Sequence, residues 1–400
     1  MRPEWTPNLY RLATEHGTIG RMKSTFTTKT FPNHHSISTG LYQESHGIIN
    51  NVMYDPLIKN EIFSHRKAEQ QSNDWWDYQH YHHHHHHQHH NHHKNCNKRS
   101  FPITPIYIAN QLYGSNRFSC CSPWIGCFAH YRNQTERARY YRPYNQSADW
   151  YEQFNWTMKH MFTNGTQMEA NLALIYISEP DSTAHDNGPF GSDTMEMLKK
   201  IDIFIEYIHR CLMETFTNIN LIMLSDHGLI EISPRRVIVL ETFLNDSTYL
   251  AYGTNPVIHI DPIDGFERTV ESALNNNLVR SLPMKIYSKD SIPNRYRYRD
   301  NRRIRSFLLV ANPGWSIYST RNEAQSMMGK RGEHGYDNQI DSMRPLFVGI
   351  GPSFKRSYFH RTSFVNVDLY PLMLHLLDIP IDQYYHQGRF HLVSGMLNEE

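Results

Sequence analysis

The sequence lacks an excess of charge of either sign: 40 lysine and arginine residues face 39 aspartate and glutamate residues, for a net charge of +1. This balance gives no argument for electrostatic attraction to nucleic acid or to a membrane surface. No run of eighteen or more apolar residues is present, so the sequence predicts no transmembrane helix. A length of 400 residues with 39% hydrophobic content is enough for a large core, and it favours one large α/β domain with insertions.

Cysteine is also scarce, with five residues in the chain. The group between 120 and 127 favours disulfide bonding in a secreted protein, with one thiol left over. Five N-x-Ser/Thr sequons are present, and such sites need exposed loops and passage through the secretory pathway. Together they predict an extracellular protein, secreted or at the cell surface, although no secretory signal is visible. The cysteines are Cys96, Cys120, Cys121, Cys127 and Cys211, and the sequon residues are Asn133, Asn145, Asn155, Asn164 and Asn245.

The coarse pattern along the chain is strand, loop, helix. Residues 171–178 and 219–225 are apolar runs of strand length that end directly before Asp181 and Asp226. Ligands lie outside the carboxyl ends of strands in an open parallel sheet, so both carboxylates are candidate site residues. Apolar residues recur with a helical period over 192–217, which predicts a strand–helix–strand crossover. A further buried strand and a closing helix are predicted at 346–351 and 367–380.

Acidic residues and histidines gather in three short signatures, EPDSTAH at 179–185, SDHG at 225–228 and GEHGYDN at 332–338. Asp181 and His185 stand four apart, which places both side chains on one face of a helical turn, where they can hold one cation. Asp226 and His227 are adjacent, which suits a loop after a strand. Carboxylate and imidazole ligands without thiolates select zinc or a similar divalent ion. Each signature alone could be a surface helix pair, a turn or a polar loop, and their joint occurrence in this order is what favours a metal site.

A hydroxyl residue, Thr30, lies upstream in the stretch TTKTFPNHHSISTGLYQESHGIINN. A threonine hydroxyl is a weak nucleophile, and metal coordination is one of the few ways to activate it. Two ions side by side stabilise both the attacking and the leaving oxygen in phosphoryl displacement. The pattern therefore predicts cleavage of a phosphoester or phosphoanhydride through a covalent threonine intermediate. The adjacent Lys29 is a candidate phosphate contact, although a lysine in a polar loop usually faces solvent.

These motifs resemble the catalytic domain of the ectonucleotide pyrophosphatase/phosphodiesterase family, within the alkaline phosphatase superfamily. The resemblance runs from about Pro7 to Leu397, and it includes TKTFPNHHSISTGLYQESHGIINNVMYDP, YISEPDSTAHDNGP, LSDHGL, NRRIRSFLLVANPGWSI, GEHGYDN and MRPLFVGIGPSFK. It implies a single phosphodiesterase catalytic domain over residues 1–400. The implied fold is alkaline-phosphatase-like α/β, with a mostly parallel central sheet and helices on both faces.

The resemblance also implies a metal role for each acidic or histidine motif. Thr30 would be the nucleophile and would bridge to the second metal. The ligands of the first zinc ion would be Asp181, His185 and His334, and those of the second would be Asp226 and His227.

Further residues match substrate-contacting positions of the family. Asn51 would donate its side-chain amide to a non-bridging phosphate oxygen, as an oxyanion-hole donor does. Phe31, Tyr144 and Tyr176 match positions that lie against the base or its sugar in nucleotide-cleaving members. The match at Tyr144 rests on the short sequence PYN.

One departure from the family concerns the second metal site. Family members begin with a buried strand that ends in Asp-Gly-Phe-Arg and supplies an aspartate to this site, and the present sequence starts after it. Glu4 and Glu15 belong to the wrong element to replace that aspartate. We therefore expect an N-terminally truncated domain, two zinc ions with the second site incomplete, and exposed sheet edges where the strand is missing. Membrane tethering would be available only through the missing N-terminus.

Residues 80–95 are a histidine-rich low-complexity insertion. Its neutral imidazoles could capture zinc, copper or nickel. The tract has no fixed ligand spacing, however, which favours a disordered surface insertion. The neighbouring Trp75, Trp76 and Tyr78 are expected to pack rather than to stack on a base.

Three functions are consistent with the sequence. The first is a zinc-dependent hydrolase of nucleotide pyrophosphate or phosphodiester bonds that releases a nucleoside 5'-monophosphate. The second is a lysophospholipid or choline phosphodiesterase of the same family, and the third is a catalytically impaired remnant. Phe31 and Tyr144 beside Asn51 favour a flat aromatic slot for a base, so the nucleotide hypothesis leads. The expected partner is a small phosphodiester, and no binding to a nucleic-acid duplex is expected.

Overall fold

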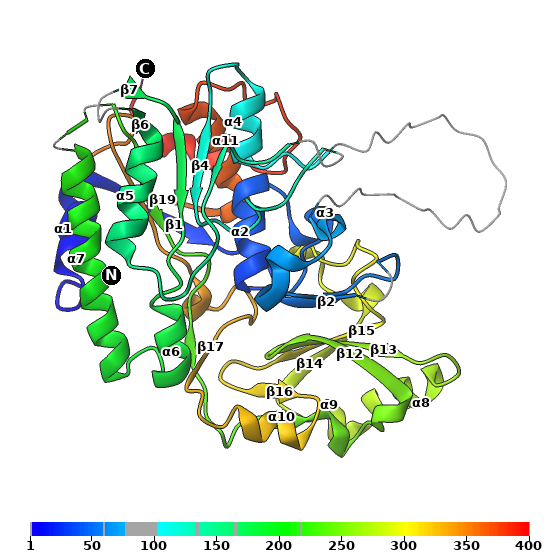
Figure 1. The fold of residues 1–400 in the computed structure, drawn as a ribbon. Coiled ribbons are helices and arrows are strands. Elements are labelled where there is room, and N and C mark those ends of the chain that lie inside the picture. Colours follow the sequence, from blue (N-terminus) through cyan, green and yellow to red (C-terminus); the bar gives the residue numbers. More distant parts are fainter. Residues whose placement is uncertain are drawn as a thin grey trace, which may run out of the picture.

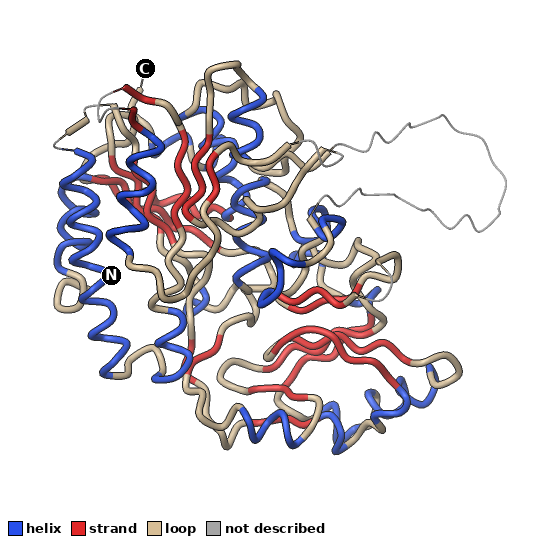
Figure 2. Tube along the Cα trace, in the orientation of Figure 1, coloured by secondary structure: helices blue, strands red, loops and turns tan. Residues whose placement is uncertain are grey.

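A computed structural model describes residues 2–58, 61–76, 102–132, 136–163, 167–213, 215–216 and 218–399. Two hydrogen-bonded sheets lie between helices in the larger part of the molecule (Figures 1 and 2). The first has the order β19 (Tyr358–Val365), β1 (Gly17–Lys23), β18 (Phe347–Ile350), β9 (Leu221–Leu224). The second has the order β5 (Tyr140–Tyr141), β4 (Ser119–Ser122), β8 (Leu172–Ile175).

Most neighbouring strands in these sheets run in the same direction. β4 is parallel to both β5 and β8, and β1 is parallel to β19. β18 is antiparallel to both of its neighbours, β1 and β9, so it is the one reversed strand of the four in its sheet. The predicted α/β class is confirmed, and the reversed β18 is the exception to a parallel sheet.

Helices cover both faces of the sheets. In Figure 1, α1 (Pro7–Arg11), α5 (Trp150–Met161) and α7 (Ser192–Met213) lie on one side. The other side carries α2 (Thr30–Thr39), α4 (Ile106–Leu112) and α11 (Leu369–Leu376). The apolar stripe predicted over 192–217 is confirmed as α7, whose Phe204 and Leu212 pack with Phe154 of α5.

The strands β8 and β9 flank the site, and each has a single hydrogen-bonded neighbour among the described residues, β4 and β18 respectively. All four residues of β9 are half-buried. The predicted crossover, which runs through α6 (Asp181–Asn187) and α7, therefore joins edge strands of two sheets and not neighbouring strands of one sheet.

A second lobe, residues 230–340, has a core of its own. Its antiparallel sheet has the order β12 (Tyr249–Thr254), β13 (Val257–Pro262), β15 (Phe307–Ala311), β14 (Met284–Ser288). Ile260, Val270 and Leu309 are fully buried in this core. Figure 1 shows α8 (Glu267–Leu274), α9 (Asn277–Arg280) and α10 (Arg321–Ser326) below the sheet. This lobe was not predicted from the sequence, and the single-domain assignment stays a prediction.

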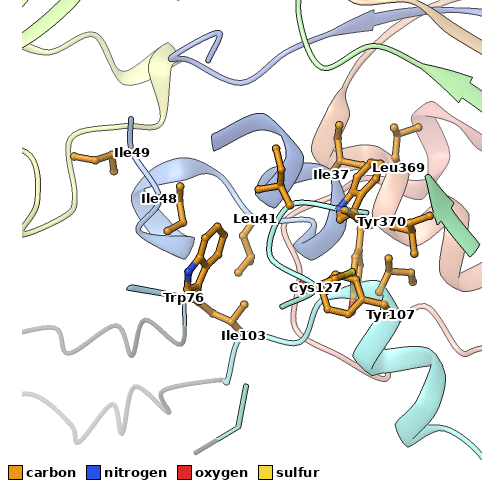
Figure 3. Close-up of a cluster of buried hydrophobic side chains, with 14 of the residues drawn as sticks. Ile37, Leu41, Ile48, Ile49, Trp76, Ile103, Tyr107, Cys127, Leu369 and Tyr370 are labelled. Carbon is orange, nitrogen blue, oxygen red and sulfur yellow. The ribbon is translucent and has the colours of Figure 1, made fainter. Parts of the chain in front are cut away.

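The largest hydrophobic core lies around α2. Figure 3 shows Ile37 of α2, Tyr107 of α4 and Leu369 of α11 in this cluster. Trp75 and Trp76 belong to the same core, with 0% and 1% of their surface exposed. Burial of one such aromatic side chain stabilises the folded state by roughly 1.5–3 kcal/mol. The prediction that the tryptophans pack is confirmed, whereas Tyr78 and the histidine-rich insertion fall outside the described residues.

Cys121 and Cys127 form a disulfide bond, which confirms the bonding predicted for this group. Cys120 is buried as a free thiol and Cys211 is half-buried and free, so two described thiols remain where one was expected. Cys96, like the sequons at Asn133 and Asn164, falls outside the described residues. The remaining three sequon residues, Asn145, Asn155 and Asn245, are exposed. Among the described residues, none of the helices combines the length and the apolar character that a membrane span requires.

Candidate active site

The first group of predicted metal ligands meets where β8 gives way to α6. Asp181 and His185 occupy successive turns of α6, and His185 Nε2 lies 3.4 Å from Asp181 Oδ2. His334 approaches from the loop after β17 (Gly332–Glu333), with its Nε2 3.7 Å from Asp181 Oδ1. The structure therefore brings together three residues that span 153 positions of the sequence, as the sequence analysis predicted.

The second group lies beside the first, in the loop after β9. His227 Nε2 is 3.0 Å from Asp226 Oδ2 and 3.2 Å from the Thr30 hydroxyl. The rings of His227 and His334 stack with centroids 3.6 Å apart, so the two groups are contiguous. Ligand atoms of Asp181, His227 and His334 all lie within 4.8 Å of one another.

Backbone carbonyls orient the three histidine rings. Nδ1 of His185 donates to Gly332 O at 2.8 Å, Nδ1 of His334 donates to Thr28 O at 2.8 Å, and Nδ1 of His227 donates to Gly228 O at 3.0 Å. A carbonyl can only accept, so each Nδ1 carries a proton and each Nε2 is the atom directed toward the cluster, where it presents a lone pair whenever the ring is neutral. Metal-ligating histidines are held in this way by partners behind the ring.

Two carboxylate oxygens in the cluster are buried without a hydrogen-bond partner among the described residues, Asp181 Oδ1 and Asp226 Oδ2. An unpaired buried carboxylate oxygen is costly unless a cation compensates it. Burial alone would raise the pKa of Asp226, but the nearby positive charge of His227, and after it that of His34, holds it below its usual range. The oxygen and nitrogen donors, with no thiolate among them, fit a zinc-like divalent ion.

The same interactions act on the histidines in opposite directions. Burial would lower the pKa of His185, but its hydrogen bond to Asp181 and the charge of Glu333 raise it to about 9. The Asp226 carboxylate outweighs burial and raises the pKa of His227. His334 is fully buried, so its pKa falls well below the usual value. A neutral His334 with a free Nε2 is ready to bind a cation.

Thr30 is the first residue of α2, so its hydroxyl lies at the positive end of a ten-residue helix. The Phe31 N–H donates to Asn51 Oδ1 at 3.1 Å. This bond fixes the amide of Asn51 and leaves its NH₂ group as the donor for a bound ligand.

The predicted substrate-contacting aromatics lie in two neighbouring clusters. Phe31 makes edge contacts with Phe63 and His65, at centroid distances of 6.0 and 5.9 Å. Tyr144, which is 46% exposed, lies 6.1 Å from the ring of Tyr176. These contacts leave their predicted roles toward a base as predictions.

Lys29 requires a correction. Its side chain does not face solvent, because it is buried and its ammonium lies 3.2 Å from Glu333 Oε1. The same ammonium donates to the carbonyl of Asn255. The structure therefore gives Lys29 internal partners, and its phosphate contact stays a prediction.

His34 is a site residue that was not predicted from the sequence. Its Nδ1 lies 3.4 Å from Asp226 Oδ2 and 2.9 Å from the Thr30 carbonyl. The ring sits between Trp124 and Tyr176, with centroids 4.9 and 4.8 Å away. The signal was present in the sequence, since His34 stands four residues after Thr30 and so shares its helix face.

A hydroxyl, carboxylates and imidazoles gather beyond the carboxyl ends of β8 and β9 in this α/β fold. This arrangement is typical of a hydrolase. A family model described as type I phosphodiesterase / nucleotide pyrophosphatase matches residues 1–337. The chain belongs to this family, and the comparisons support a hydrolase of the nucleotide pyrophosphatase/phosphodiesterase type.

Two human relatives illustrate the similarity. The bis(5'-adenosyl)-triphosphatase of Homo sapiens is 34% identical over 381 residues, which cover 93% of this chain and 74% of that protein. Ectonucleotide pyrophosphatase/phosphodiesterase family member 5 of Homo sapiens is 30% identical over 397 residues, which cover 98% of this chain and 74% of that protein. The resemblance found in the motifs is thereby confirmed at the level of the family.

Solved structures show the same fold. The murine ectonucleotide pyrophosphatase/phosphodiesterase 5 superposes with a TM-score of 0.83 at 29% identity, covering 98% of this chain and 95% of that chain. An inactive threonine-to-alanine variant of the murine protein, in complex with AMP, matches with the same TM-score. The alkaline-phosphatase-like α/β fold is therefore shown.

Proposed function

We propose that the chain is a zinc-dependent hydrolase that cleaves nucleotide pyrophosphate or phosphodiester bonds and releases a nucleoside 5'-monophosphate. The observation that carries this proposal is the meeting of the Thr30 hydroxyl with two contiguous groups of carboxylates and imidazoles. One zinc ion would be held by Asp181, His185 and His334, and the second by Asp226, His227 and the hydroxyl of Thr30. When bound, the two ions would supply positive charge that favours the ionised hydroxyl and the developing oxyanion.

The chain's own groups define the covalent step. The Thr30 oxygen forms a bond to phosphorus while the bond from phosphorus to the leaving-group oxygen breaks, so the nucleotidyl group becomes an ester of Thr30. Water then cleaves this ester, which releases the monophosphate and restores the hydroxyl. The Asn51 amide donates to a non-bridging oxygen as charge develops there. The positive end of α2 adds to that stabilisation.

A nucleotide is favoured over a lipid as the substrate. The exposed ring of Tyr144 beside Tyr176 offers a flat surface on which a base can stack. The AMP complex of the murine relative and the name of the human bis(5'-adenosyl)-triphosphatase support the same choice. Lysophospholipid or choline phosphodiesters remain the alternative within the family.

The test uses the full chain with zinc in excess. We expect release of nitrophenol from the p-nitrophenyl ester of thymidine 5'-monophosphate and little release of choline from lysophosphatidylcholine. Turnover of the lipid alone would favour the lipid alternative. Turnover of neither substrate by a zinc-loaded protein would favour the impaired remnant.

We also propose an extracellular location. The Cys121–Cys127 disulfide supports it, because such bonds persist in oxidising compartments. The exposed sequon residues Asn145 and Asn245 are accessible to glycosylation. Recovery of N-glycosylated protein from the culture medium of a eukaryotic host would support this location, and retention of unglycosylated protein in the cytosol would contradict it.

A further inference from the structure

Two segments about 300 residues apart are joined beside the site by a set of hydrogen bonds. The Thr28 carbonyl accepts from His334 Nδ1 at 2.8 Å. The Thr28 hydroxyl accepts from the Gly335 N–H at 2.9 Å and donates to the Tyr336 carbonyl at 3.0 Å. Lys29 directly follows Thr28 on the first segment. Glu333 directly precedes His334 on the second. The nucleophile Thr30 and the ligand His334 thus belong to one connected unit.

Lys29 and Glu333 form a buried ion pair at the centre of this unit. They are 3% and 7% exposed, and Lys29 Nζ lies 3.2 Å from Glu333 Oε1. Glu333 Oε1 also accepts from the His334 N–H at 2.9 Å. Glu333 Oε2 accepts from Asn255 Nδ2 at 2.9 Å, and the Asn255 carbonyl accepts from Lys29. Both charges are therefore compensated by each other and by neutral partners.

The backbone at Gly335 leaves room for the Lys29 side chain. Gly335 has φ +117°, and a Cβ at this position would lie 2.5 Å from Cε of Lys29. A side chain at residue 335 would displace the lysine stem from between the two segments. The ion pair and the glycine after His334 are thus parts of one arrangement.

Two other roles are open to these charges, and each would require the pair to separate. Glu333 could be a metal ligand, because its carboxylate lies within 4.8 Å of ligand atoms of His185 and His334. Lys29 could be a phosphate contact, because it adjoins Thr30. Either role would leave the other charge buried without its partner, which is strongly unfavourable.

We propose that Lys29 and Glu333 are a pair of positioning residues that hold Thr30 in register with His334. The inference rests on the proposed function, namely on a zinc ion held by Asp181, His185 and His334. Glu333 acts through the backbone N–H of His334 and through Lys29. Lys29 acts through its own backbone, which leads directly into Thr30. Neither side chain touches the metal or the substrate.

The variants Lys29→Met and Glu333→Gln test the proposal, together with the variant that carries both changes. Zinc affinity is measured by competition with a chromophoric chelator, and AMP affinity is measured by calorimetry on the zinc-loaded chain. We expect both single changes to weaken zinc binding, by about tenfold to a hundredfold, as changes to groups behind a metal ligand do. We expect the double variant to bind zinc no more weakly than the weaker single variant, because no unpaired charge remains.

The two competing roles predict that the two single variants differ from each other in their effect on zinc or AMP affinity. If Glu333 were a ligand, Lys29→Met would free it and strengthen zinc binding while Glu333→Gln weakened it. If Lys29 were a phosphate contact, Lys29→Met would weaken AMP binding and Glu333→Gln would not. Either result would overturn the proposal, and so would a double variant whose loss equals the sum of the single losses.

Folding and the proposed function are controlled separately. Lys200→Met removes a lysine from an exposed ion pair with Glu196 on α7 and is expected to leave zinc affinity unchanged. If a single variant fails to fold, the uncharged double variant decides, because the proposal requires it to fold and to bind zinc. A parent chain whose zinc binding does not depend on Asp181 would refute the proposed function. The positioning role fails if the parent binds zinc as proposed but Lys29→Met and Glu333→Gln change zinc or AMP affinity in the way that one of the competing roles predicts.

Discussion

The hydroxyl oxygen of Thr30 lies 3.2 Å from Nε2 of His227, although the two residues are 197 positions apart in the sequence. The contact depends on a bond on the far side of the ring, where His227 Nδ1 donates to the Gly228 carbonyl and turns Nε2 toward the start of α2. A candidate nucleophile and a candidate metal ligand are thereby brought to one point, and the proposed chemistry depends on this juxtaposition.

Removal of the Thr30 hydroxyl should abolish turnover. Thr30→Ala is expected to lose hydrolysis of the nitrophenyl nucleotide ester while it keeps its tightly bound zinc, because the first group of ligands does not include Thr30. Thr30→Ser retains a hydroxyl and should keep part of the activity. Steady-state kinetics and metal analysis on the same preparations give the comparison, and a fully active alanine variant would rule out the covalent route.

Zinc content should respond differently to the two groups of ligands. Replacement of Asp181, His185 or His334 should lower the tightly bound zinc by about one ion per chain, since loss of one ligand removes much of the affinity of a tetrahedral site. Asp226→Asn should affect a second, weaker ion, because the described part of the chain supplies that group with two strong ligands, Asp226 and His227, and a hydroxyl. We therefore expect turnover to rise mainly after the first equivalent of zinc is bound.

The zinc experiment needs a chain without adventitious metal. Deletion of residues 80–93 removes the histidine tract and should leave the number of tight zinc ions unchanged. Unchanged stoichiometry after all three substitutions at the first group would contradict the assignment of these ligands.

The side-chain amide of Asn51 should contribute to the rate of hydrolysis and not to zinc binding. Asn51→Asp keeps an oxygen to accept from the Phe31 N–H, but it replaces the donating NH₂ with an anion. A loss of about 10²–10³ in kcat is expected, the usual consequence of removing an oxyanion-hole donor. The zinc content should not change. Full activity in this variant would remove Asn51 from the proposed mechanism.

The sequence predicted the parts of the fold that depend on local pattern. The stripe over 192–217 became α7 because its apolar positions recur with the helical period, and Asp181 and His185 met on α6 because four residues make about one turn. Their meeting with His334, and that of Thr30 with His227, came from the family resemblance. Spacing alone does not specify such distant contacts.

Features that depend on tertiary packing were not predicted. The antiparallel sheet of the second lobe pairs strands such as β13 and β15, whose register is set by contacts about 50 residues apart. Lys29 looked like a solvent-facing residue because its partner, Glu333, is about 300 residues away. The reversed direction of β18 likewise follows from its two neighbours and not from its own apolar run.

Acid should destabilise the chain partly through His35, a buried histidine that lies against Trp76 and Tyr131. Burial, with the charge of Arg303 second, lowers the pKa of His35 to about 3. The unfolded chain, with a pKa near 6.5, then binds one more proton, so stability is present above about pH 6.5 and is lost as the pH falls toward 3. Between about pH 7.5 and 5 this single group should cost about 2 kcal/mol.

The variant His35→Phe isolates that contribution. Its free energy of unfolding in urea should fall by about 2 kcal/mol less than that of the parent over the same pH interval. His391→Phe, at an exposed position, is the matched control and should keep the pH dependence of the parent. An unchanged pH dependence in His35→Phe would show that this histidine is not the acid-sensitive group.

The central claim is that Thr30 carries the nucleotidyl group during catalysis. The most direct test is to mix the zinc-loaded chain with the p-nitrophenyl ester of thymidine 5'-monophosphate, to quench the reaction in acid within the first turnover, and to map the modified peptide by mass spectrometry. The account predicts a thymidylyl group on Thr30 that disappears as the substrate is consumed and that is absent from Thr30→Ala. Nitrophenol release at the full rate with the peptide unmodified, or with the nucleotide on another residue, would contradict it.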